Sequence, residues 1–339
     1  MGEEKSSCVR VPARIAEKIL ELLRGEGLLE SSLKPKRDGQ HVLFPVKNPE
    51  RAVALLSKSG YNVEACTGRF EKRRDRQGRL GGPVKSYTLI GGIAVFSWNP
   101  KFSIEDYRRA ALELLEANPR VRSVYLKLDT AGEYRVPRLL HLAGADSTVA
   151  VVREYGLEFE VDVSRVYYNP RLQDERRRVA LLVGDDEIVL DMFAGIGVFP
   201  IHIASLRRAR IVSNDINPEA ARLAYRNVLR NRKRLKGCVS VSLGDAILLD
   251  RVFKPVFDRI IMNNPTMTPR FLPTALNLLA GKGGLIHYYR LSGSCREALE
   301  EAVQAAGSRV SLELVGCRRV LEHSPGRHVY VLDLKAEKG

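Results

Sequence analysis

The sequence is poor in cysteine, and the few cysteines form no recognisable pattern. The 339 residues include five of them, which are odd in number, widely spaced and never arranged as Cys-x-x-Cys: Cys8, Cys66, Cys238, Cys295 and Cys317. This spacing predicts neither a disulfide framework nor a structural zinc site. We therefore expect small core or surface residues at these positions, and no metal site.

Long apolar runs are also missing. No segment approaches the roughly 18 to 20 apolar residues that a transmembrane helix needs. The first residues, Met1 to Lys5, lack the basic, apolar and small-residue regions of a signal peptide. We expect a cytoplasmic protein that does not contact a membrane. No protein partner is evident.

Acidic residues are too few to balance the basic ones. The sequence has 40 Asp and Glu against 55 Lys and Arg, which gives a formal net charge of +15 and a pI near 9.7. Such an excess is typical of a protein that binds a polyanion, and nucleic acid is favoured because no membrane segment is present. At about 150 residues per domain, the length predicts two or three domains.

The first 172 residues read as two small α+β domains joined by a linker. Residues 1–68 show a helix over 13–23, a strand over 41–46 and a second helix over 49–59, because their apolar residues recur at helical or strand spacing. Residues 69–85 are basic, glycine-rich and aperiodic, and predict a linker whose charge serves solubility or follows a phosphate backbone.

The middle domain, residues 86–172, shows strands and one helix in alternation. We expect strands over 88–96, 124–128 and 157–163 and a helix over 104–118. From residue 173 to residue 339, short apolar runs alternate with helical segments and end in two alternating runs, 309–315 and 328–334. This order predicts an α/β fold: a C-terminal, doubly wound, Rossmann-like domain with an antiparallel pair at the sheet edge.

The segment over 187–199 contains the most informative motif. An apolar run ends at Asp191, breaks at Gly195 and Gly197, and resumes with helix-compatible residues, as in a nucleotide-binding turn. Asp215 ends the next apolar run at roughly the spacing of a carboxylate that binds a ribose diol. Because Pro200 replaces the third glycine of the dinucleotide fingerprint, we expect S-adenosylmethionine instead of a nicotinamide dinucleotide.

Two further polar positions follow predicted strands. Asp245 comes after the third strand of the C-terminal domain and is placed to accept a hydrogen bond from an adenine amino group. Asn263, Asn264 and Pro265 end the fourth strand, where a planar base could be held by its edge. The competing interpretation of the second site is an ordinary turn, which Asn-Pro commonly starts.

Taken together, the ordered motifs resemble the archaeal and eukaryotic tRNA (guanine-N1)-methyltransferases. The resemblance runs from about residue 125 to the end of the chain, and more loosely over the first domain. The matching segments are 132–136, 141–144, 166–172, 175–176, 191–197, 215–218 and 287–289. It implies methylation of the guanosine at position 37, on the 3′ side of the anticodon. It also implies that the first domain docks on the tRNA elbow and that other domains contact the anticodon arm.

The resemblance also implies roles for individual residues. Glu175 matches the general base, Arg135 matches the arginine at guanine O6, and Asn263 completes the catalytic set. The matching cofactor-binding positions are Tyr167, Asp191, Phe193, Gly195, Gly197, Asp215, Ile216, Asp245, Asn263 and Pro265. Without the resemblance, Glu175 reads as a solvated surface carboxylate, and Arg135 as a phosphate contact or surface charge.

One position departs from the family pattern. The usual Asn-Leu-Pro after the fourth strand is replaced by Asn263-Asn264-Pro265. The resemblance includes archaeal enzymes that also methylate a tricyclic wyosine precursor at carbon, and Asn264 leaves that activity open. A branch that transfers an aminocarboxypropyl group is less favoured. Two other classes remain: a methyltransferase for protein or small molecules, and a non-catalytic RNA-binding protein.

Overall fold

The structure is a computed structural model that describes residues 3–30, 32–71, 82–132, 134, 136–307, 310–324 and 326–338. Its contacts divide the chain into two compact units, Met1–Arg79 and Leu80–Gly339, and each is described by itself. The predicted domain boundaries at residues 68, 85 and 172 stay predictions. Most of the predicted linker, residues 72–81, lies outside the described residues.

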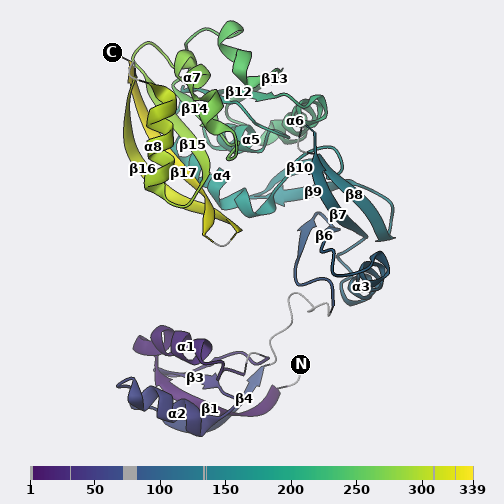
Figure 1. The fold of residues 1–339 in the computed structure, drawn as a ribbon, viewed down its shortest axis with the longest axis vertical. Coiled ribbons are helices and arrows are strands. Elements are labelled where there is room, and N and C mark those ends of the chain that lie inside the picture. The colour runs from purple at the N-terminus through teal and green to yellow at the C-terminus, as the bar shows by residue number, and fades with distance from the viewer. Residues whose placement is uncertain are drawn as a thin grey trace. The chain divides into compact units, whose positions relative to one another are not determined.

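The N-terminal unit is an antiparallel sheet with two helices (Figure 1). The strands, in the order β2-β3-β1-β4, are β1 (Glu3–Pro12), β2 (Lys36–Asp38), β3 (His41–Pro45) and β4 (Glu64–Glu71). The helices are α1 (Ala16–Gly25), which follows the 3-10 turn η1 (Ala13–Ile15), and α2 (Pro49–Lys58). Both pack one apolar stripe onto the sheet, through Ile19 and Leu23 on α1 and Leu56 on α2. The sequence predicts both helices and β3 but not β1, whose first residues are mostly polar.

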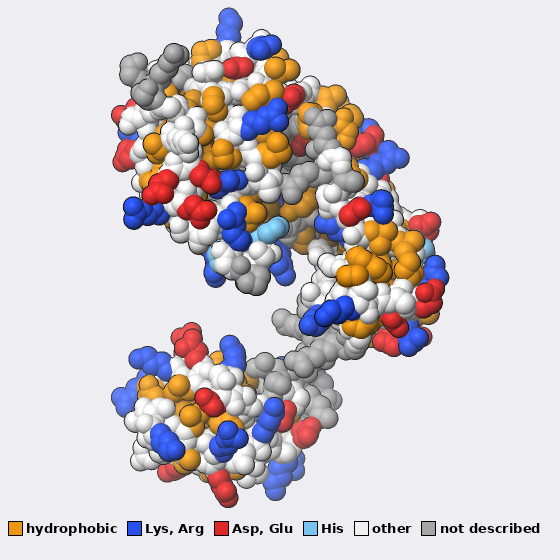
Figure 2. Space-filling model, in the orientation of Figure 1, with side chains coloured by type: hydrophobic (Ala, Val, Ile, Leu, Met, Phe, Trp, Pro, Cys, Tyr) orange, Lys and Arg blue, Asp and Glu red, His pale blue; other side chains and the backbone are white. Residues whose placement is uncertain are grey.

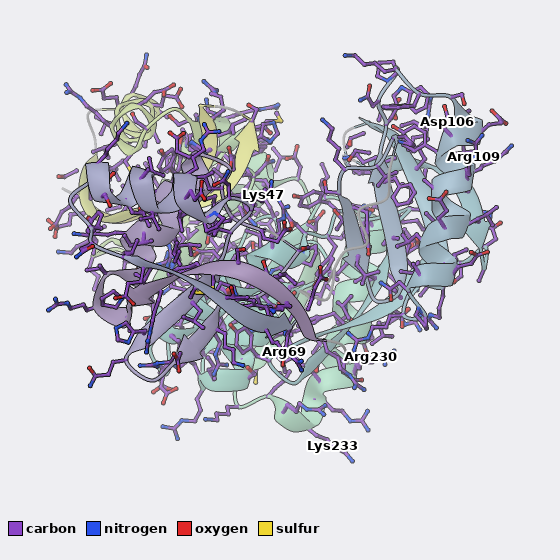
Figure 3. The ribbon with its side chains drawn as sticks, turned by 90° about the horizontal axis from the view of Figure 1, so that it is seen from below. Lys47, Arg69, Asp106, Arg109, Arg230 and Lys233 are labelled. Carbon is purple, nitrogen blue, oxygen red and sulfur yellow. A yellow bond between two sulfur atoms is a disulfide. The ribbon has the colours of Figure 1, made fainter. Side chains whose placement is uncertain are left out.

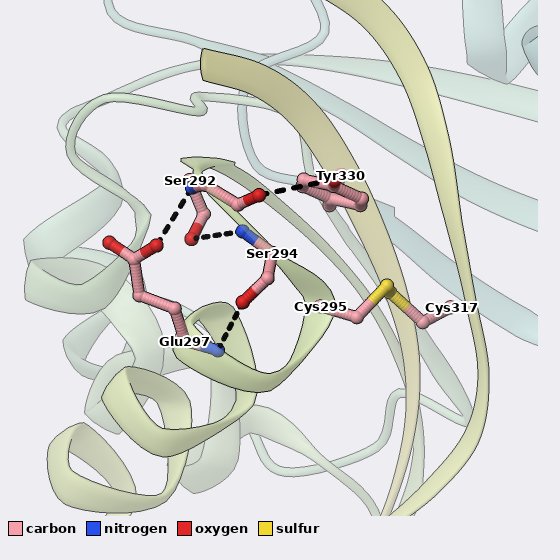
Figure 4. The surroundings of a disulfide bond; sticks show 7 residues. Ser292, Ser294, Cys295, Glu297, Cys317 and Tyr330 are labelled. Carbon is pink, nitrogen blue, oxygen red and sulfur yellow. Dashed lines mark hydrogen bonds between the residues drawn. A yellow bond between two sulfur atoms is a disulfide. The ribbon is translucent and has the colours of Figure 1, made fainter. Parts of the chain in front are cut away.

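Four of the five cysteines are paired, so the prediction of unpaired cysteines is wrong for them. Cys8 on β1 lies opposite Cys66 on β4 in the antiparallel register and forms a disulfide with it. Cys295 begins α8 (Cys295–Ala306) and is bonded to Cys317 on β16 (Val310–Ser324) (Figure 4). The partners are 58 and 22 residues apart. The cysteines of each pair meet because the fold brings distant segments together, and the short-range spacing of cysteines in the sequence does not indicate this. Cys238 is free and exposed.

The second unit begins with a sheet of order β5-β6-β7-β8. Its strands are β5 (Tyr87–Ile90), β6 (Ile93–Ser97), β7 (Ser123–Ala131) and β8 (Val136–Gly144), with α3 (Ile104–Ala117) between β6 and β7. The single strand predicted over 88–96 is in fact the hairpin β5-β6. Gly91 and Gly92 have φ angles of 53° and 94°, and this left-handed backbone ends β5 because an extended strand cannot contain it.

The hairpin β9 (Val149–Glu154) and β10 (Leu157–Asp162) connects this sheet to the larger one. Asn227 and Asn231, one turn apart on α6 (Pro218–Asn231), bind the backbone of β10. Their amides donate to the carbonyls of Glu160 and Glu158 and accept from the same two peptide N–H groups. These bonds satisfy the backbone of β10 on its unpaired edge.

The larger sheet has the order β13-β12-β11-β14-β15-β17-β16. Its other strands are β11 (Ile188–Asp191), β12 (Arg210–Asp215), β13 (Cys238–Leu243), β14 (Arg259–Met262), β15 (Gly284–Ser292) and β17 (Arg327–Lys338). Five strands are parallel, whereas β17 and β16 form the predicted antiparallel pair at the edge. The helices that cover its faces are α4 (Gln173–Leu182), α5 (Val198–Leu206), α6, α7 (Thr268–Leu278) and α8. Short 3-10 turns complete the domain: η2 (Pro170–Leu172), η3 (Arg232–Arg234) and η4 (Ala246–Arg251). This confirms the Rossmann-like prediction.

Cationic side chains are spread over both units. On the face drawn in Figure 2, acidic side chains lie among them. None of the helices in the described parts of the chain is long and apolar enough to cross a membrane.

Candidate active site

Two glycines allow β11 to turn sharply into α5. Gly195 and Gly197 have φ angles of 55° and 81°, in the left-handed region that favours glycine. The N–H of Ala194 donates to the Asn214 carbonyl at 2.8 Å. A Cβ on Gly197 would lie 3.2 Å from the Cβ of Ala224. The turn is therefore packed closely against the end of β12 and against α6.

Asp215 ends β12 with its carboxylate directed at the turn. Its Oδ2 accepts from the Gly195 N–H at 2.7 Å, and its Oδ1 accepts from the Asn217 N–H at 2.9 Å. Burial raises the pKa of Asp215, although these N–H groups oppose the shift. Each carboxylate oxygen still has a lone pair available for a ligand.

Asp191, at the end of β11, is fully buried. Its Oδ1 accepts from the Phe193 N–H at 3.2 Å, while Oδ2 has no hydrogen-bond partner among the described residues. Burial raises the pKa of Asp191 to about 8, and the nearby Asp215 carboxylate adds to the effect. An unsatisfied buried oxygen is costly, so this position is suited to a ligand that supplies a cation or a donor.

The other predicted cofactor residues lie at the same edge of the sheet. Phe193 packs edge-to-face on Phe271 with ring centroids 4.9 Å apart, and Ile216 is half-buried. Asp245 follows β13 and accepts from the Ile247 N–H at 3.1 Å. Tyr167 is 59% exposed, and a Cβ on Gly195 would lie 3.8 Å from its carbonyl oxygen. An exposed ring beside the turn is therefore free to contact a ligand.

The loop after β14 is tied to the end of β15. The N–H of Leu291 donates to the Pro265 carbonyl at 2.9 Å. The Thr268 hydroxyl lies within hydrogen-bond distance of the Asn264 and Tyr289 carbonyls, which share its single hydrogen. Asn263 lies two residues after Ile261, whose side chain packs on the α4 side of the sheet. Asn263 itself comes directly after β14, which ends at Met262.

Glu175 is buried against the same side of the sheet, not solvated. Its side chain is only 3% exposed, because Arg178 and Tyr289 enclose the carboxylate. The Arg178 guanidinium donates to both carboxylate oxygens, at 2.8 and 2.9 Å. The Tyr289 hydroxyl donates to Oε1 at 2.7 Å. The only further cation recorded near it among the described residues is Arg318, 3.8 Å from Oε2.

Arg178 extends this arrangement into a polar seam between α4 and the sheet. Arg178 also donates to both oxygens of Asp333, at 2.7 and 3.2 Å. His287 Nδ1 lies 2.6 Å from Asp333, and its Nε2 lies 3.0 Å from the Arg259 guanidinium. Since arginine only donates, Nε2 is the acceptor and Nδ1–H donates to Asp333. We call Glu175, Arg178, His287, Tyr289 and Asp333 the polar seam.

Burial and hydrogen bonding set the charges of the polar seam. Burial lowers the pKa of His287 despite its bond to Asp333, so the imidazole is neutral. Burial opposes ionisation of Asp333, but the His287 and Arg178 hydrogen bonds prevail and lower its pKa. Burial and the Glu175 charge hold the pKa of Tyr289 well above 10. Tyr289 is therefore a neutral hydrogen-bond donor to an ionised Glu175.

A second buried cluster fixes the segment between Tyr167 and Glu175. Glu154 on β9 accepts from Arg176, from the Tyr168 hydroxyl at 2.6 Å and from His202 Nε2 at 2.9 Å. Arg176 also donates to the Asn169 carbonyl at 3.0 Å. Burial would raise the pKa of Glu154, but these three donors lower it. The sequence prediction missed this cluster because its members lie on β9, α4, α5 and the loop before η2.

The structure brings most predicted site residues to the carboxyl ends of β11, β12, β13 and β14, as expected of a ligand site in an open α/β sheet. Glu175 joins them through Tyr289, whose carbonyl is bonded to the loop after Asn263. Arg135 lies outside the described residues. Arg178 was also missed, although its spacing of three residues from Glu175 on a helix is a signal for pairing. No cluster of metal-ligating side chains occurs in the described ranges.

Two family models match the chain. The TRM5/TYW2 methyltransferase domain matches residues 150–313, and the tRNA methyltransferase 5 N-terminal domain matches residues 8–54. A Saccharolobus solfataricus protein, tRNA 4-demethylwyosine(37)-methyltransferase Taw21, is 32% identical over 259 residues, covering 74% of this chain and 94% of its own.

Similarity to other proteins extends over the whole chain. The Pyrococcus abyssi tRNA (guanine(37)-N(1))-methyltransferase Trm5b is 31% identical over 341 residues, covering 96% of this chain and 98% of its own. Its crystal structure aligns with a TM-score of 0.67 at 29% identity, over 98% and 99% of the two chains. A complex of aTrm5 with tRNALeu aligns with a TM-score of 0.66 at 25% identity, over 97% and 99%. The chain belongs to the TRM5/TYW2 family of tRNA methyltransferases.

Proposed function

We propose that this enzyme transfers a methyl group from S-adenosylmethionine to N1 of guanosine 37 in tRNA. One observation carries the proposal: Asp191, the glycine turn, Asp215 and the Asn263 loop follow the carboxyl ends of neighbouring strands, and Glu175 is buried against Tyr289 of the next strand, β15. The full-length similarity to a tRNA (guanine(37)-N(1))-methyltransferase supports it. The cytoplasmic location stays a prediction.

The residues at the turn fit S-adenosylmethionine. Asp215 would accept hydrogen bonds from the ribose diol, and Asp245 would accept one from the adenine amino group. Asp191 has a buried oxygen with no hydrogen-bond partner in the described part of the chain, and the methionine ammonium would supply one. Phe193, Ile216 and Tyr167 would contact the adenosine. Gly195 leaves room along the turn, and Gly197 lets the turn pack against α6. When bound, the cofactor supplies a sulfonium methyl group, whose C–S electron pair stays with sulfur as N1 bonds the carbon.

Glu175 is the proposed general base. Guanine N1 carries a proton, and its electron pair becomes fully available for the methyl carbon only as that proton leaves. Glu175 would take the proton and become neutral. Hydrogen bonds from Arg178 and Tyr289 hold its carboxylate in place.

The remaining groups would orient the base and hold its charge. Arg135 would stabilise the negative charge that develops on guanine O6, as a fixed cation does in a transition state. The Asn263 side chain would hold the base by its edge, and Pro265 fixes the loop that carries it. Tyr167 would cover the ring with its exposed aromatic face.

Phosphate contacts would hold the tRNA on both units. We infer that the N-terminal unit docks on the elbow and that the second unit contacts the anticodon arm. At the end of α6, Arg232, Lys233, Arg234 and Lys236 are exposed, and no ion pair with another described residue is recorded for them. Figure 3 shows Lys233 pointing away from the chain there. We expect the logarithm of the tRNA binding constant to fall linearly with the logarithm of salt concentration, and a flat dependence would contradict phosphate binding.

A carbon methylation of the wyosine precursor is the second candidate. Asn264 departs from the family pattern, and the similarity to Taw21 covers most of the chain. The Asn264 side chain accepts from the Thr266 hydroxyl at 3.4 Å, so it belongs to the loop that borders the base. Aminocarboxypropyl transfer is less favoured, because the Asn-x-Pro loop and Asp215 follow the methyltransferase pattern.

The test is methyl transfer from labelled S-adenosylmethionine to two sets of transcripts, followed by nucleoside identification. One set carries guanosine, adenosine, cytidine or uridine at position 37, and the other is tRNA with the demethylwyosine precursor. The proposal predicts 1-methylguanosine from the guanosine transcript alone in the first set. Product only from the precursor tRNA would establish the second candidate instead. No transfer to any RNA would contradict both.

A further inference from the structure

The proposed general base is hydrogen-bonded at both carboxylate oxygens. Arg178 contacts both oxygens of Glu175, and Tyr289 contacts one of them. A buried carboxylate with these donors stays ionised, because hydrogen bonds to the charged form favour it. The same donors weaken its attraction for a proton, which a base needs. The surroundings must therefore compensate for that loss.

The compensation comes from Asp333. Arg178 serves two carboxylates, Glu175 and Asp333, so one buried positive charge faces two negative ones. His287 is neutral because its Nε2 accepts from Arg259, and Arg259 is itself balanced by Glu187. The polar seam thus carries a net charge of −1. The Arg318 side chain is 54% exposed, so solvent weakens its contribution.

Resting on the proposed function, we propose that Arg178 is a positioning residue for proton transfer. It holds the Glu175 carboxylate ionised and oriented together with the Tyr289 hydroxyl, while Asp333 keeps Arg178 neutralised when Glu175 takes the guanine N1 proton. The transfer breaks the N1–H bond, forms an O–H bond on Glu175 and changes the charge of the polar seam from −1 to zero. The Arg178–Asp333 pair remains as a balanced ion pair.

Two structural details support separate roles for Glu175 and Asp333 as partners of Arg178. Arg178 reaches Glu175 through Nε and Nη2, whereas Nη1 is directed only to Asp333. The planar guanidinium therefore holds both carboxylates at once, which a lysine ammonium cannot do with the same geometry. His287 orients Asp333 from the other side through a fixed tautomer. Each partner of Arg178 is thus constrained independently.

The test measures single-turnover methyl transfer to a guanosine-37 transcript between about pH 5 and 9. Arg178→Lys keeps the charge but loses the two-oxygen contact. We expect about ten- to a hundredfold slower transfer. The acid limb of the pH–rate profile, where the rate rises with pH, should move up by about one pH unit. Tyr289→Phe should move the limb in the same direction by less. Asp333→Asn removes a negative charge, so its limb should move to lower pH.

The matched control is Arg222→Lys, an exposed arginine on α6 that pairs with Glu219, which should change neither the rate nor the limb. A purely structural role for Arg178 would lower the unfolding temperature and leave the rate and limb of the folded variants unchanged, which would overturn the proposal. If Arg178→Lys folds poorly, the single variants Tyr289→Phe and Asp333→Asn still test the proposal, because their acid limbs should shift in opposite directions.

The failure of the proposed function looks different. If Glu175→Gln transfers methyl at the wild-type rate, then Glu175 is not the base and the base assignment fails. If Glu175→Gln is slow but Arg178→Lys, Tyr289→Phe and Asp333→Asn keep the wild-type pH profile, only the present inference fails. In a Glu175→Gln background, Arg178→Lys should add little further loss, since residues that act as a unit are not additive.

Discussion

The glycine turn at the carboxyl end of β11 and the polar seam between α4 and the sheet are built in different ways. The turn consists of residues close together in sequence and shaped by local backbone geometry, with Gly195 and Gly197 in the left-handed region. The polar seam joins α4, β15 and β17, and Arg178 lies 155 residues from Asp333. The turn is thus suited to a role in cofactor binding, while the seam is suited to proton transfer. Variants in the two regions should therefore change different kinetic constants.

The largest effect should come from Glu175→Gln in the polar seam. Glutamine keeps the size of the side chain but cannot take a full proton, and the loss of a general base typically slows reactions by about a hundred- to ten-thousandfold. We expect that loss in single-turnover transfer at neutral pH. Raising the pH should partly restore the rate, because solvent then deprotonates guanine N1.

The neighbouring acid provides the control. Asp174 is adjacent in sequence and accepts from the Tyr155 hydroxyl outside the polar seam, so Asp174→Asn should transfer at nearly the wild-type rate. Equal losses in both variants would show that charge on α4 matters, and not the position of Glu175.

A smaller effect is expected from Asp215→Ala in the turn. Loss of the hydrogen bonds to the ribose diol should weaken cofactor binding by roughly ten- to a hundredfold, since a bond to a charged acceptor contributes about 1.5 to 3 kcal/mol. Calorimetry of cofactor binding measures this directly. Asp250→Ala, where the carboxylate contacts only Asn277 among the described residues, should bind like the wild type.

An effect of a different kind, on the pH dependence of stability instead of on rate or affinity, is expected at Asp191. Its pKa is raised from 3.8 to about 8, so the folded state binds a proton more tightly than the unfolded state. The stability that this tighter proton binding gives the folded state is present in full below about pH 4 and is lost as the pH rises to about 8. The asparagine of Asp191→Asn resembles the protonated acid at every pH, so this variant should not show this loss of stability as the pH rises. Unfolding midpoints between pH 5 and 8 should therefore fall more steeply for the wild type than for this variant, and parallel profiles would contradict the assignment.

The same contrast explains what the sequence could predict. The turn, Asp215 and the helix after it follow from short patterns, and Asn217 caps α6 by accepting from the Glu219 N–H. The parallel, doubly wound architecture of the C-terminal sheet follows from the alternation of elements. The burial of Glu175 does not follow, because it depends on Tyr289 and Asp333 from distant strands. The two disulfides and the split of the predicted strand 88–96 were missed because long-range pairing and left-handed glycines decide them.

The most direct test of the division between the two regions compares Asp215→Ala and Glu175→Gln in single turnover over a wide range of cofactor concentration. Saturating cofactor should restore Asp215→Ala to nearly the wild-type rate, whereas Glu175→Gln should bind cofactor normally and stay slow at every concentration. The reverse pattern, or a Glu175→Gln variant that recovers at high cofactor concentration, would contradict the assignment of cofactor binding to the turn and proton transfer to the polar seam.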